Sequence, residues 1–136
     1  MDLSIVIPLY NEGESIIELN SSIYNVLSKS DVKFELIYVD DGSTDNSWKN
    51  LIEISKNQSN IYACRFLKNY GKSMALSAGF NKSKGRVVIT MDADLQDDPN
   101  EILPLYKMIN DGDNDIVSGW KKKRYDSVIF KNIPSK

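Results

Sequence analysis

Two carboxylates stand two positions apart where an apolar stretch of the chain ends. The stretch 87–91 leads into Asp92 and Asp94, and Gln96 follows two residues later. Side chains at positions i and i+2 of a strand point to the same side, so both carboxylates can enter one crevice at the strand's end. Carboxylate and amide oxygens are hard ligands that suit Mg²⁺ or Mn²⁺, and such an ion would hold phosphate oxygens. The spacing therefore predicts a metal site made by Asp92, Asp94 and Gln96.

The same acidic stretch has a second interpretation, as a polar loop that starts a helix. Asp97 or Asp98 can cap a helix with Pro99 in its first turn, and we adopt this interpretation for these three residues. For Asp92 and Asp94 it is only the alternative, because a buried apolar stretch rarely ends in unpaired charges. An Asp-x-Asp pair has little specificity by itself, so the rest of the chain must supply the context.

The composition is that of an ordinary globular domain and excludes several kinds of catalysis. The 136 residues are 41% hydrophobic and 26% charged, and a chain of this size can bury a useful core. The sequence has no histidine, which excludes a Ser-His or Cys-His pair, and its single cysteine, Cys64, excludes a cysteine zinc cluster. No apolar run approaches the ~20 residues that span a membrane, and no signal peptide opens the chain, so we expect a reducing, cytoplasmic setting.

The charge is divided unevenly along the chain. Residues 121–136 carry six basic side chains and one acidic one, a net charge of +5, whereas residues 1–120 carry 11 basic and 18 acidic side chains, a net charge of −7. A basic end on an acidic body suggests an anionic partner for that end, with a solvated tail as the alternative. The acidic body argues against nucleic-acid binding.

Apolar runs alternate with segments of helical periodicity. This alternation predicts an α/β fold with a mostly parallel sheet covered by helices on both faces. No element is predicted after Trp120, so we expect a domain at 1–120, a basic segment at 121–136 and the front part of a longer protein. The predicted strands are 3–8, 34–39, 61–66, 86–91 and 115–119, the predicted helices are 16–28, 48–55, 71–84 and 99–111, and Met74, Ala75, Ala78 and Phe80 are expected to face the core.

Three of the predicted strands end in polar sequences, and ligands of open α/β sheets bind beyond the carboxyl ends of strands. Carboxylates at three strand ends repel one another unless a cation or the hydrogen-bond donors of a ligand fill the space. The first two sequences suit a nucleotide base and ribose, and the third suits a metal and a diphosphate. There is no glycine-rich phosphate loop, so metal and basic side chains must hold the phosphates. The three sequences are Pro8-Leu9-Tyr10-Asn11-Glu12, Asp40-Asp41-Gly42-Ser43 and Asp92-Ala93-Asp94.

Four motifs follow one another along the chain: Ile7-Pro8-Leu9-Tyr10-Asn11-Glu12, Val39-Asp40-Asp41-Gly42-Ser43-Thr44-Asp45, Asn69-Tyr70-Gly71-Lys72 and Met91-Asp92-Ala93-Asp94-Leu95-Gln96-Asp97-Asp98-Pro99. Their order and spacing resemble those of family 2 glycosyltransferases with the GT-A fold. The extended fourth motif resembles the polyprenyl-phosphate branch, which includes dolichol-phosphate mannose synthases and undecaprenyl-phosphate glucosyltransferases. The resemblance covers residues 3 to about 127.

The resemblance implies a role for each matching residue. Asp40 or Asp41 would hold the nucleotide base, and Lys72 would fix the loop or the phosphates. Asp92 would meet the ribose and diphosphate, with Ala93 beside it, and Asp94 and Gln96 would bind the metal. The residues implied to line the base are Pro8, Tyr10, Asn11 and Glu12.

The basic segment 119–126 resembles the Gly-x-Arg-x-x-Arg-x-Asp loop of the family, which faces the phosphates of donor and acceptor. Arg124 matches this loop and is implied to be catalytic together with Asp92 and Asp94. Lys121 stands where the family commonly has an arginine, and it keeps the charge without the bidentate fork.

Several of these residues also have purely structural interpretations. Tyr10 and Asn11 can build a turn, and Lys72 can be an ordinary lysine at a helix start. For the segment 43–45 we adopt the structural interpretation, a turn that caps the next helix.

The function that the resemblance implies is transfer of a sugar, with inversion, from a UDP-glucose or GDP-mannose type of donor to a polyprenyl phosphate at the cytoplasmic face of a membrane. Mg²⁺ or Mn²⁺ would neutralise the departing diphosphate. A phosphate acceptor is already ionised near neutral pH, which agrees with a chain that lacks histidine. The alternatives are a GT-A glycosyltransferase with a saccharide acceptor, and a nucleotide-sugar-binding module without activity.

Overall fold

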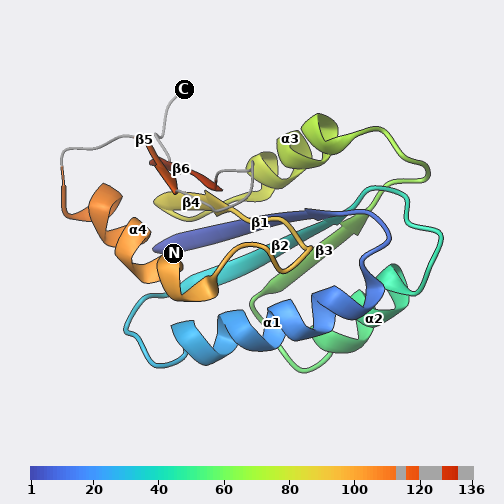
Figure 1. The fold of residues 1–136 in the computed structure, drawn as a ribbon, viewed down its shortest axis with the longest axis horizontal. Coiled ribbons are helices and arrows are strands. Elements are labelled where there is room, and N and C mark those ends of the chain that lie inside the picture. Colours follow the sequence, from blue (N-terminus) through green and yellow to red (C-terminus); the bar gives the residue numbers. More distant parts are fainter. Residues whose placement is uncertain (113–115, 120–126, 132–136) are drawn as a thin grey trace.

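The protein is built around a central sheet (Figure 1). The computed structural model describes residues 1–112, 116–119 and 127–131, and within them the sheet has six strands in the order β3-β2-β1-β4-β6-β5. The β1–β2, β2–β3 and β1–β4 pairs are parallel, whereas β6 pairs antiparallel with both β4 and β5. The strands are β1 Leu3–Leu9, β2 Phe34–Asp40, β3 Ile61–Arg65, β4 Val87–Thr90, β5 Ile116–Gly119 and β6 Ser127–Lys131.

Helices cover both faces of the sheet, which explains why its central strands are almost continuously apolar. Helices α1 (Gly13–Leu27), α2 (Ser47–Ser55) and α4 (Ile102–Asn110) share one core with alternate residues of β1, whereas α3 (Lys72–Lys82) lies on the opposite face (Figure 1). The core residues of α1 recur at intervals of three and four, as an amphipathic helix requires. They are Ile16, Leu19, Ile23 and Leu27.

Helix α3 packs on its smallest residues. Ala75 and Gly79 are its buried positions, and a Cβ on Gly79 would lie 2.3 Å from Cγ1 of Val6. This close approach of helix and sheet leaves no room for large side chains in between. Met74 is 55% exposed and Phe80 37% exposed, so the prediction that they face the core is wrong, whereas Ala75 does face it.

The α/β architecture with a mostly parallel sheet confirms the prediction from the sequence, and two details correct it. Strand β6 was not predicted, since no element was expected after Trp120. The predicted end of the first strand at Pro8 is also wrong, because β1 continues through Leu9. The division into a domain and a basic segment at residue 120 stays a prediction.

Strand β1 accommodates Pro8 because β4 is shorter than β1. Val6 accepts a hydrogen bond from the N–H of Met91 at 3.0 Å, and Leu9 accepts one from the N–H of Asp41 at 2.9 Å. Polar groups of alternate residues point to opposite neighbours, so the nitrogen of Pro8 faces the side of β4. Pairing between β1 and β4 has already ended at Val6. The missing N–H of Pro8 therefore leaves no ladder hydrogen bond unmade.

Candidate functional site

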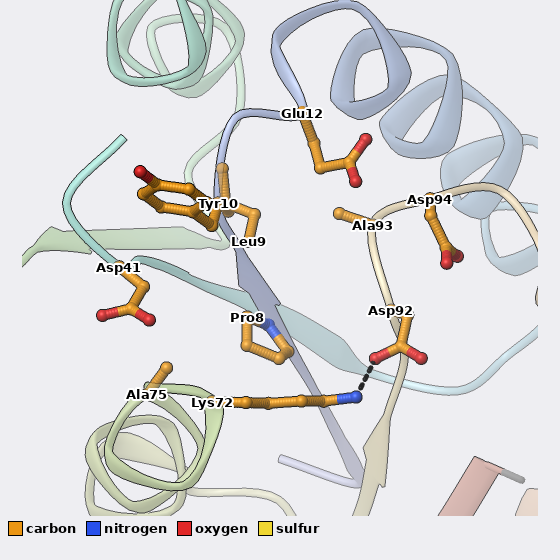
Figure 2. Close-up of a pocket in the computed structure, with 10 residues that line it drawn as sticks. All are labelled: Pro8, Leu9, Tyr10, Glu12, Asp41, Lys72, Ala75, Asp92, Ala93 and Asp94. Carbon is orange, nitrogen blue, oxygen red and sulfur yellow. Dashed lines mark hydrogen bonds and ion pairs between the residues drawn. The ribbon is translucent and has the colours of Figure 1, made fainter. Parts of the chain in front are cut away.

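A pocket of about 290 Å³ lies beyond the carboxyl ends of β1, β2 and β4 (Figure 2). The start of α3 forms its remaining wall. This is the place where the sequence predicted a site, because parallel strands present their following loops at one edge of the sheet. The lining residues are Pro8, Leu9, Tyr10, Glu12, Asp41, Lys72, Ala75, Asp92, Ala93 and Asp94.

In the loop after β4, successive side chains alternate between the core and the pocket, and this alternation places two carboxylates at the pocket. Met91 and Ala93 are each 3% exposed and belong to the core, so Asp92 and Asp94 turn toward the pocket. The N–H of Gln96 donates a hydrogen bond to Oδ1 of Asp94 at 3.2 Å. The Gln96 side chain is exposed and does not line the pocket, so its predicted place among the metal ligands stays a prediction.

Lys72 reaches across the pocket from the first position of α3. Its Nζ lies 2.6 Å from Oδ1 of Asp92, and this ion pair joins α3 to the loop after β4 (Figure 2). The lysine side chain is 54% exposed, so solvent screens this ion pair and weakens its contribution to stability. Lys72 is thus a residue of the pocket and also the first residue of a helix.

The structure distinguishes between the two adjacent acids after β2. Asp41 lines the pocket, whereas Asp40 is fully buried, does not line it, and accepts a hydrogen bond from the N–H of Ser43 at 2.9 Å. The Asp41 carboxylate accepts the N–H groups of Tyr70 at 2.7 Å and Gly71 at 3.0 Å. A carboxylate has about four acceptor positions, so these two bonds leave capacity for a donor on a ligand.

Asn11 joins the loops after β1 and β2 and does not line the pocket. Its backbone is left-handed, with φ of 54°. Its Oδ1 accepts the N–H of Thr44 at 2.8 Å and that of Asp45 at 3.3 Å, and its own N–H donates to Oγ of Ser43 at 2.8 Å. This is the turn-building role that the sequence left open, and the predicted contact of Asn11 with a nucleotide stays a prediction.

Asp45 continues this connection to the start of α2. It accepts hydrogen bonds from the N–H of Ser47 at 2.9 Å and from the N–H of Gly13 at 3.2 Å. Burial alone would raise the pKa of Asp45, but the hydrogen bonds from Ser47 and Gly13 hold the pKa below its ordinary value. The cap position of α2 is Asn46, so Asp45 bonds to the first residue of the helix from one position before the cap.

The structure also shows which of Asp97 and Asp98 caps the turn that begins at Pro99. Asp98 accepts the N–H of Asn100 at 3.0 Å at the start of a short 3₁₀ turn, Pro99–Glu101, which leads into α4. Asp97 has a different partner, since its Oδ2 accepts the N–H of Asp92 at 3.0 Å.

Negative charge accumulates on the side of the pocket away from α3. Burial raises the pKa of Glu12, and the nearby carboxylates of Asp94 and Asp45 raise it further, against a hydrogen bond with Ser15 that lowers it. In Figure 2 the Glu12 carboxylate is turned toward the Ala93–Asp94 turn. A cation placed here would relieve this repulsion.

The donor set of the pocket fits Mg²⁺ or Mn²⁺ bound together with a diphosphate. Asp92 and Asp94 offer hard carboxylate oxygens, and these ions commonly use one or two carboxylates and take their other ligands from water and phosphate. Over residues 1–112, 116–119 and 127–131, no three His, Cys, Asp or Glu side chains gather into a metal-holding group. The protein therefore offers part of a coordination shell, and a diphosphate would have to supply more of it.

Two pocket residues were not predicted as site residues, namely Leu9 and Ala75. Ala75 lies one helical turn after Lys72, so helical periodicity from Lys72 would have found it. The predicted phosphate-binding residues Lys121 and Arg124 lie outside the described residues. Among the helices that the structure describes, none is both long enough and apolar enough to cross a membrane.

Comparison with known sequences supports the resemblance. The protein is 42% identical over 130 residues to the undecaprenyl-phosphate 4-deoxy-4-formamido-L-arabinose transferase of Proteus mirabilis, covering 95% of this chain and 40% of the relative. It is 32% identical over 136 residues to the dodecaprenyl-phosphate galacturonate synthase of Rhizobium johnstonii, covering 99% of this chain and 40% of the relative. The chain thus spans about 40% of the length of these relatives.

Solved structures agree on the fold. The mannosyltransferase PcManGT from Pyrobaculum calidifontis, in complex with GDP-Man and Mn²⁺, superposes with a TM-score of 0.79 at 21% identity, over 95% of this chain and 44% of that chain. Residues 1–349 of S. aureus TarS, in complex with UDP-GlcNAc, give a TM-score of 0.67 at 25% identity, over 85% of this chain and 33% of that chain. The sequence matches glycosyl transferase family 2 over residues 4–135. This match, together with the shared GT-A fold, shows that the chain belongs to glycosyl transferase family 2.

Proposed function

We propose that this chain holds the donor site of an inverting transferase that moves a sugar from a nucleotide diphosphate-sugar to a polyprenyl phosphate. The observation that carries the proposal is the arrangement of the pocket. Asp92, which pairs with Lys72, and Asp94 lie at one end, while Tyr10 and Asp41 lie toward the other (Figure 2). The names of the relatives supply the acceptor class, since both are transferases or synthases of polyprenyl phosphates.

The base of the nucleotide would occupy the part of the pocket beside β1 and β2. Tyr10 is 44% exposed and offers a ring face for stacking. Asp41 can accept an N–H of a uracil or guanine ring in addition to its two backbone donors. The pyrrolidine ring of Pro8 closes the floor between them.

The diphosphate would occupy the part of the pocket beside β4 and α3. A divalent ion held by Asp92 and Asp94 would supply positive charge to the departing diphosphate. The Lys72 ammonium, which pairs with Asp92 in this structure, would contact a phosphate oxygen of the same ligand. Its three donors suit a point contact with phosphate.

The acceptor phosphate needs no base to ionise it, because a phosphate monoester is already charged near neutral pH. Arg124 and Lys121 are proposed to hold it, in keeping with the basic character of residues 121–136. That segment would also attract the anionic headgroups of a cytoplasmic membrane surface, at ~1 kcal/mol per well-placed basic residue.

The proposal is tested by incubating the purified protein with UDP-glucose or GDP-mannose and a short polyprenyl phosphate, with Mn²⁺ or with EDTA. We expect transfer of the sugar to the lipid phosphate in the presence of Mn²⁺ only. Transfer that persists in EDTA would contradict the proposed metal dependence. Transfer to a saccharide but not to the lipid would contradict the proposed polyprenyl phosphate acceptor.

A second candidate is nucleotide-sugar binding without transfer, which is favoured by one observation: the chain spans about 40% of its relatives. Isothermal titration with the same donors distinguishes the two candidates. Metal-dependent binding without any transfer would support this second candidate and retain the donor site.

A further inference from the structure

We propose that Asp97 is a positioning residue that shapes the turn carrying Asp92 and Asp94. The proposal deepens the proposed function, since it rests on this turn being the metal and diphosphate side of the donor site. Helix capping does not explain Asp97, because Asp98 performs that role. Asp97 is only 7% exposed, and its Oδ2 accepts the N–H of Asp92 at 3.0 Å.

The turn needs a stabilising contact because its backbone is anchored in the core on one side and must bend sharply on the other. Met91 and Ala93 are anchored in the core, which fixes the direction of the two carboxylates between and after them. Beyond Asp94 the chain must turn sharply, and Leu95 adopts φ of 67°, a left-handed conformation that is unfavourable for a residue other than glycine. An unfavourable conformation persists only where surrounding contacts enforce it.

Two hydrogen bonds enclose the left-handed residue. The inner one joins the N–H of Gln96 to Oδ1 of Asp94 at 3.2 Å, and the outer one joins the N–H of Asp92 to Oδ2 of Asp97 at 3.0 Å. The outer bond starts at Asp92 and ends at Asp97, so Asp94 lies within the loop that this bond closes. Asp97 therefore fixes the relative placement of Asp92 and Asp94 without lining the pocket itself.

The role of the Asp97 side chain as a hydrogen-bond acceptor can be distinguished from the role of its negative charge. A buried carboxylate among other acids is costly, so its retention needs a compensating contact. The hydrogen bond to Asp92 uses one oxygen of this carboxylate as the acceptor of a backbone N–H. Asparagine offers the same oxygen without the charge, whereas alanine offers neither. A positioning role predicts that Asp97→Asn behaves as the unchanged protein and Asp97→Ala does not.

The experiment compares the unchanged chain with Asp97→Ala, Asp97→Asn and the control Asp98→Ala. Asp98 is the adjacent acid and makes a cap of its own, so its removal tests for a general effect of losing an aspartate from this loop. Binding of UDP and of GDP is measured by isothermal titration with Mn²⁺ and with EDTA. Exchange of the Asp92 amide hydrogen is measured by NMR without metal.

We expect Asp97→Ala to weaken the Mn²⁺-dependent binding about 10- to 100-fold, the range found when residues that orient metal ligands are removed. Binding in EDTA should stay unchanged, and the Asp92 amide should exchange faster. Asp97→Asn should restore both properties, and Asp98→Ala should alter neither. A general loss of structure would weaken binding in EDTA as well.

Three results would overturn the inference: unchanged Mn²⁺-dependent binding in Asp97→Ala, equal losses with Asp97→Asn, or unchanged exchange of the Asp92 amide. If the unchanged chain binds neither nucleotide, the proposed function fails, and the amide exchange still decides whether Asp97 holds this turn. If Asp97→Ala does not fold, Asp97→Leu takes its place, because leucine has a similar shape and no acceptor.

Discussion

The two ends of the pocket are held together in different ways. Beside β1 and β2, the two loops share a continuous set of hydrogen bonds in which backbone N–H groups donate to Asn11, Ser43, Asp45 and Ser47. Beside β4, the contacts include the Lys72–Asp92 ion pair and two hydrogen bonds within one short turn. The first end is fixed without a ligand, whereas the second carries charges that a metal and a diphosphate would complete.

This difference shows that one end of a pocket can be preorganised by its own hydrogen bonds while the other end depends on a ligand. Acceptors that are satisfied by backbone N–H groups keep their geometry whether or not a ligand is bound. Carboxylates that face one another keep theirs at an electrostatic cost. The pKa of Glu12 is raised first by burial and then by the nearby carboxylates of Asp94 and Asp45. Substitutions at the β4 end should therefore alter metal-dependent binding, and substitutions at the β1–β2 end should alter the stability of the fold.

The largest effect is expected at the β4 end. Asp94→Ala should lower sugar transfer about 100- to 1000-fold, because the charge on the departing diphosphate would lose its metal-dependent stabilisation. Thermal unfolding should hardly change, since the hydrogen bond of the Asp94 side chain to the N–H of Gln96 is local and its charge repels Glu12. Steady-state assays in Mn²⁺ and calorimetry measure the two quantities. Normal transfer by this variant would show that Asp94 is no part of the site.

The next effect concerns the contact between the loops after β2 and β3. A Cβ on Gly42 would lie 2.4 Å from the carbonyl carbon of Lys68, and Gly42 has φ of 77°. Gly42→Ala should lower the free energy of unfolding by about 2–4 kcal/mol, through both the clash and the left-handed backbone. Urea unfolding gives the value.

Gly71→Ala is the matched control for this prediction. Gly71 also has a positive φ, of 105°, but nothing lies within 4 Å of an added Cβ. It should cost the strain of its positive φ and extended ψ of 159°, about 1–3 kcal/mol, and no clash. A loss at Gly42 no larger than its own backbone strain would show that the clash at Gly42 is relieved elsewhere.

A smaller effect tests the connection through Asn11. Asn11→Ala should lower the free energy of unfolding by about 1–3 kcal/mol, because the side-chain acceptor is lost and the left-handed backbone disfavours alanine. Asn11→Gly keeps the backbone conformation and loses only the acceptor, so it should cost less. A difference between them in the opposite direction would contradict the geometry of the loop. Chemical unfolding of both variants decides this.

The smallest effect is a dependence of stability on pH. The pKa of Glu12 is raised in the folded protein, so its contribution to stability is complete below its ordinary pKa and is lost as the pH rises through the raised value. Glu12→Gln should therefore raise Tm at neutral pH and have less effect in acid. Glu14→Gln, at an exposed position on the same helix, is the control. A pH-independent change in Tm would show that Glu12 is not perturbed.

The sequence predicted the parallel part of the sheet because its central strands β1 and β2 are buried on both faces and read as apolar runs. It did not predict β6, because Ser127–Lys131 is short and follows a run of charged residues, and only pairing with β4 and β5 makes it a strand. Tertiary pairing of this kind leaves no periodicity in the sequence.

The sequence could not predict in which direction the side chains of adjacent acidic residues point. Asp40 and Asp41 are adjacent and chemically identical, yet one is buried under the Ser43 turn and the other lines the pocket, because successive strand residues face opposite ways. Asp97 and Asp98 differ in the same manner, one bonding back to Asp92 and the other forward to Asn100. Residue types predicted the chemistry at both places, and only the backbone path decides which acid performs which role.

The position of Pro8 has a consequence for what can enter the pocket. Beyond the last pair of β1 with β4, Pro8 and Leu9 continue β1 along the wall of the pocket, and both residues are buried. Pro8 has no N–H, so the backbone offers a ligand no donor at this position. A ligand would meet an apolar ring there, and its hydrogen bonds would fall to the neighbouring residues.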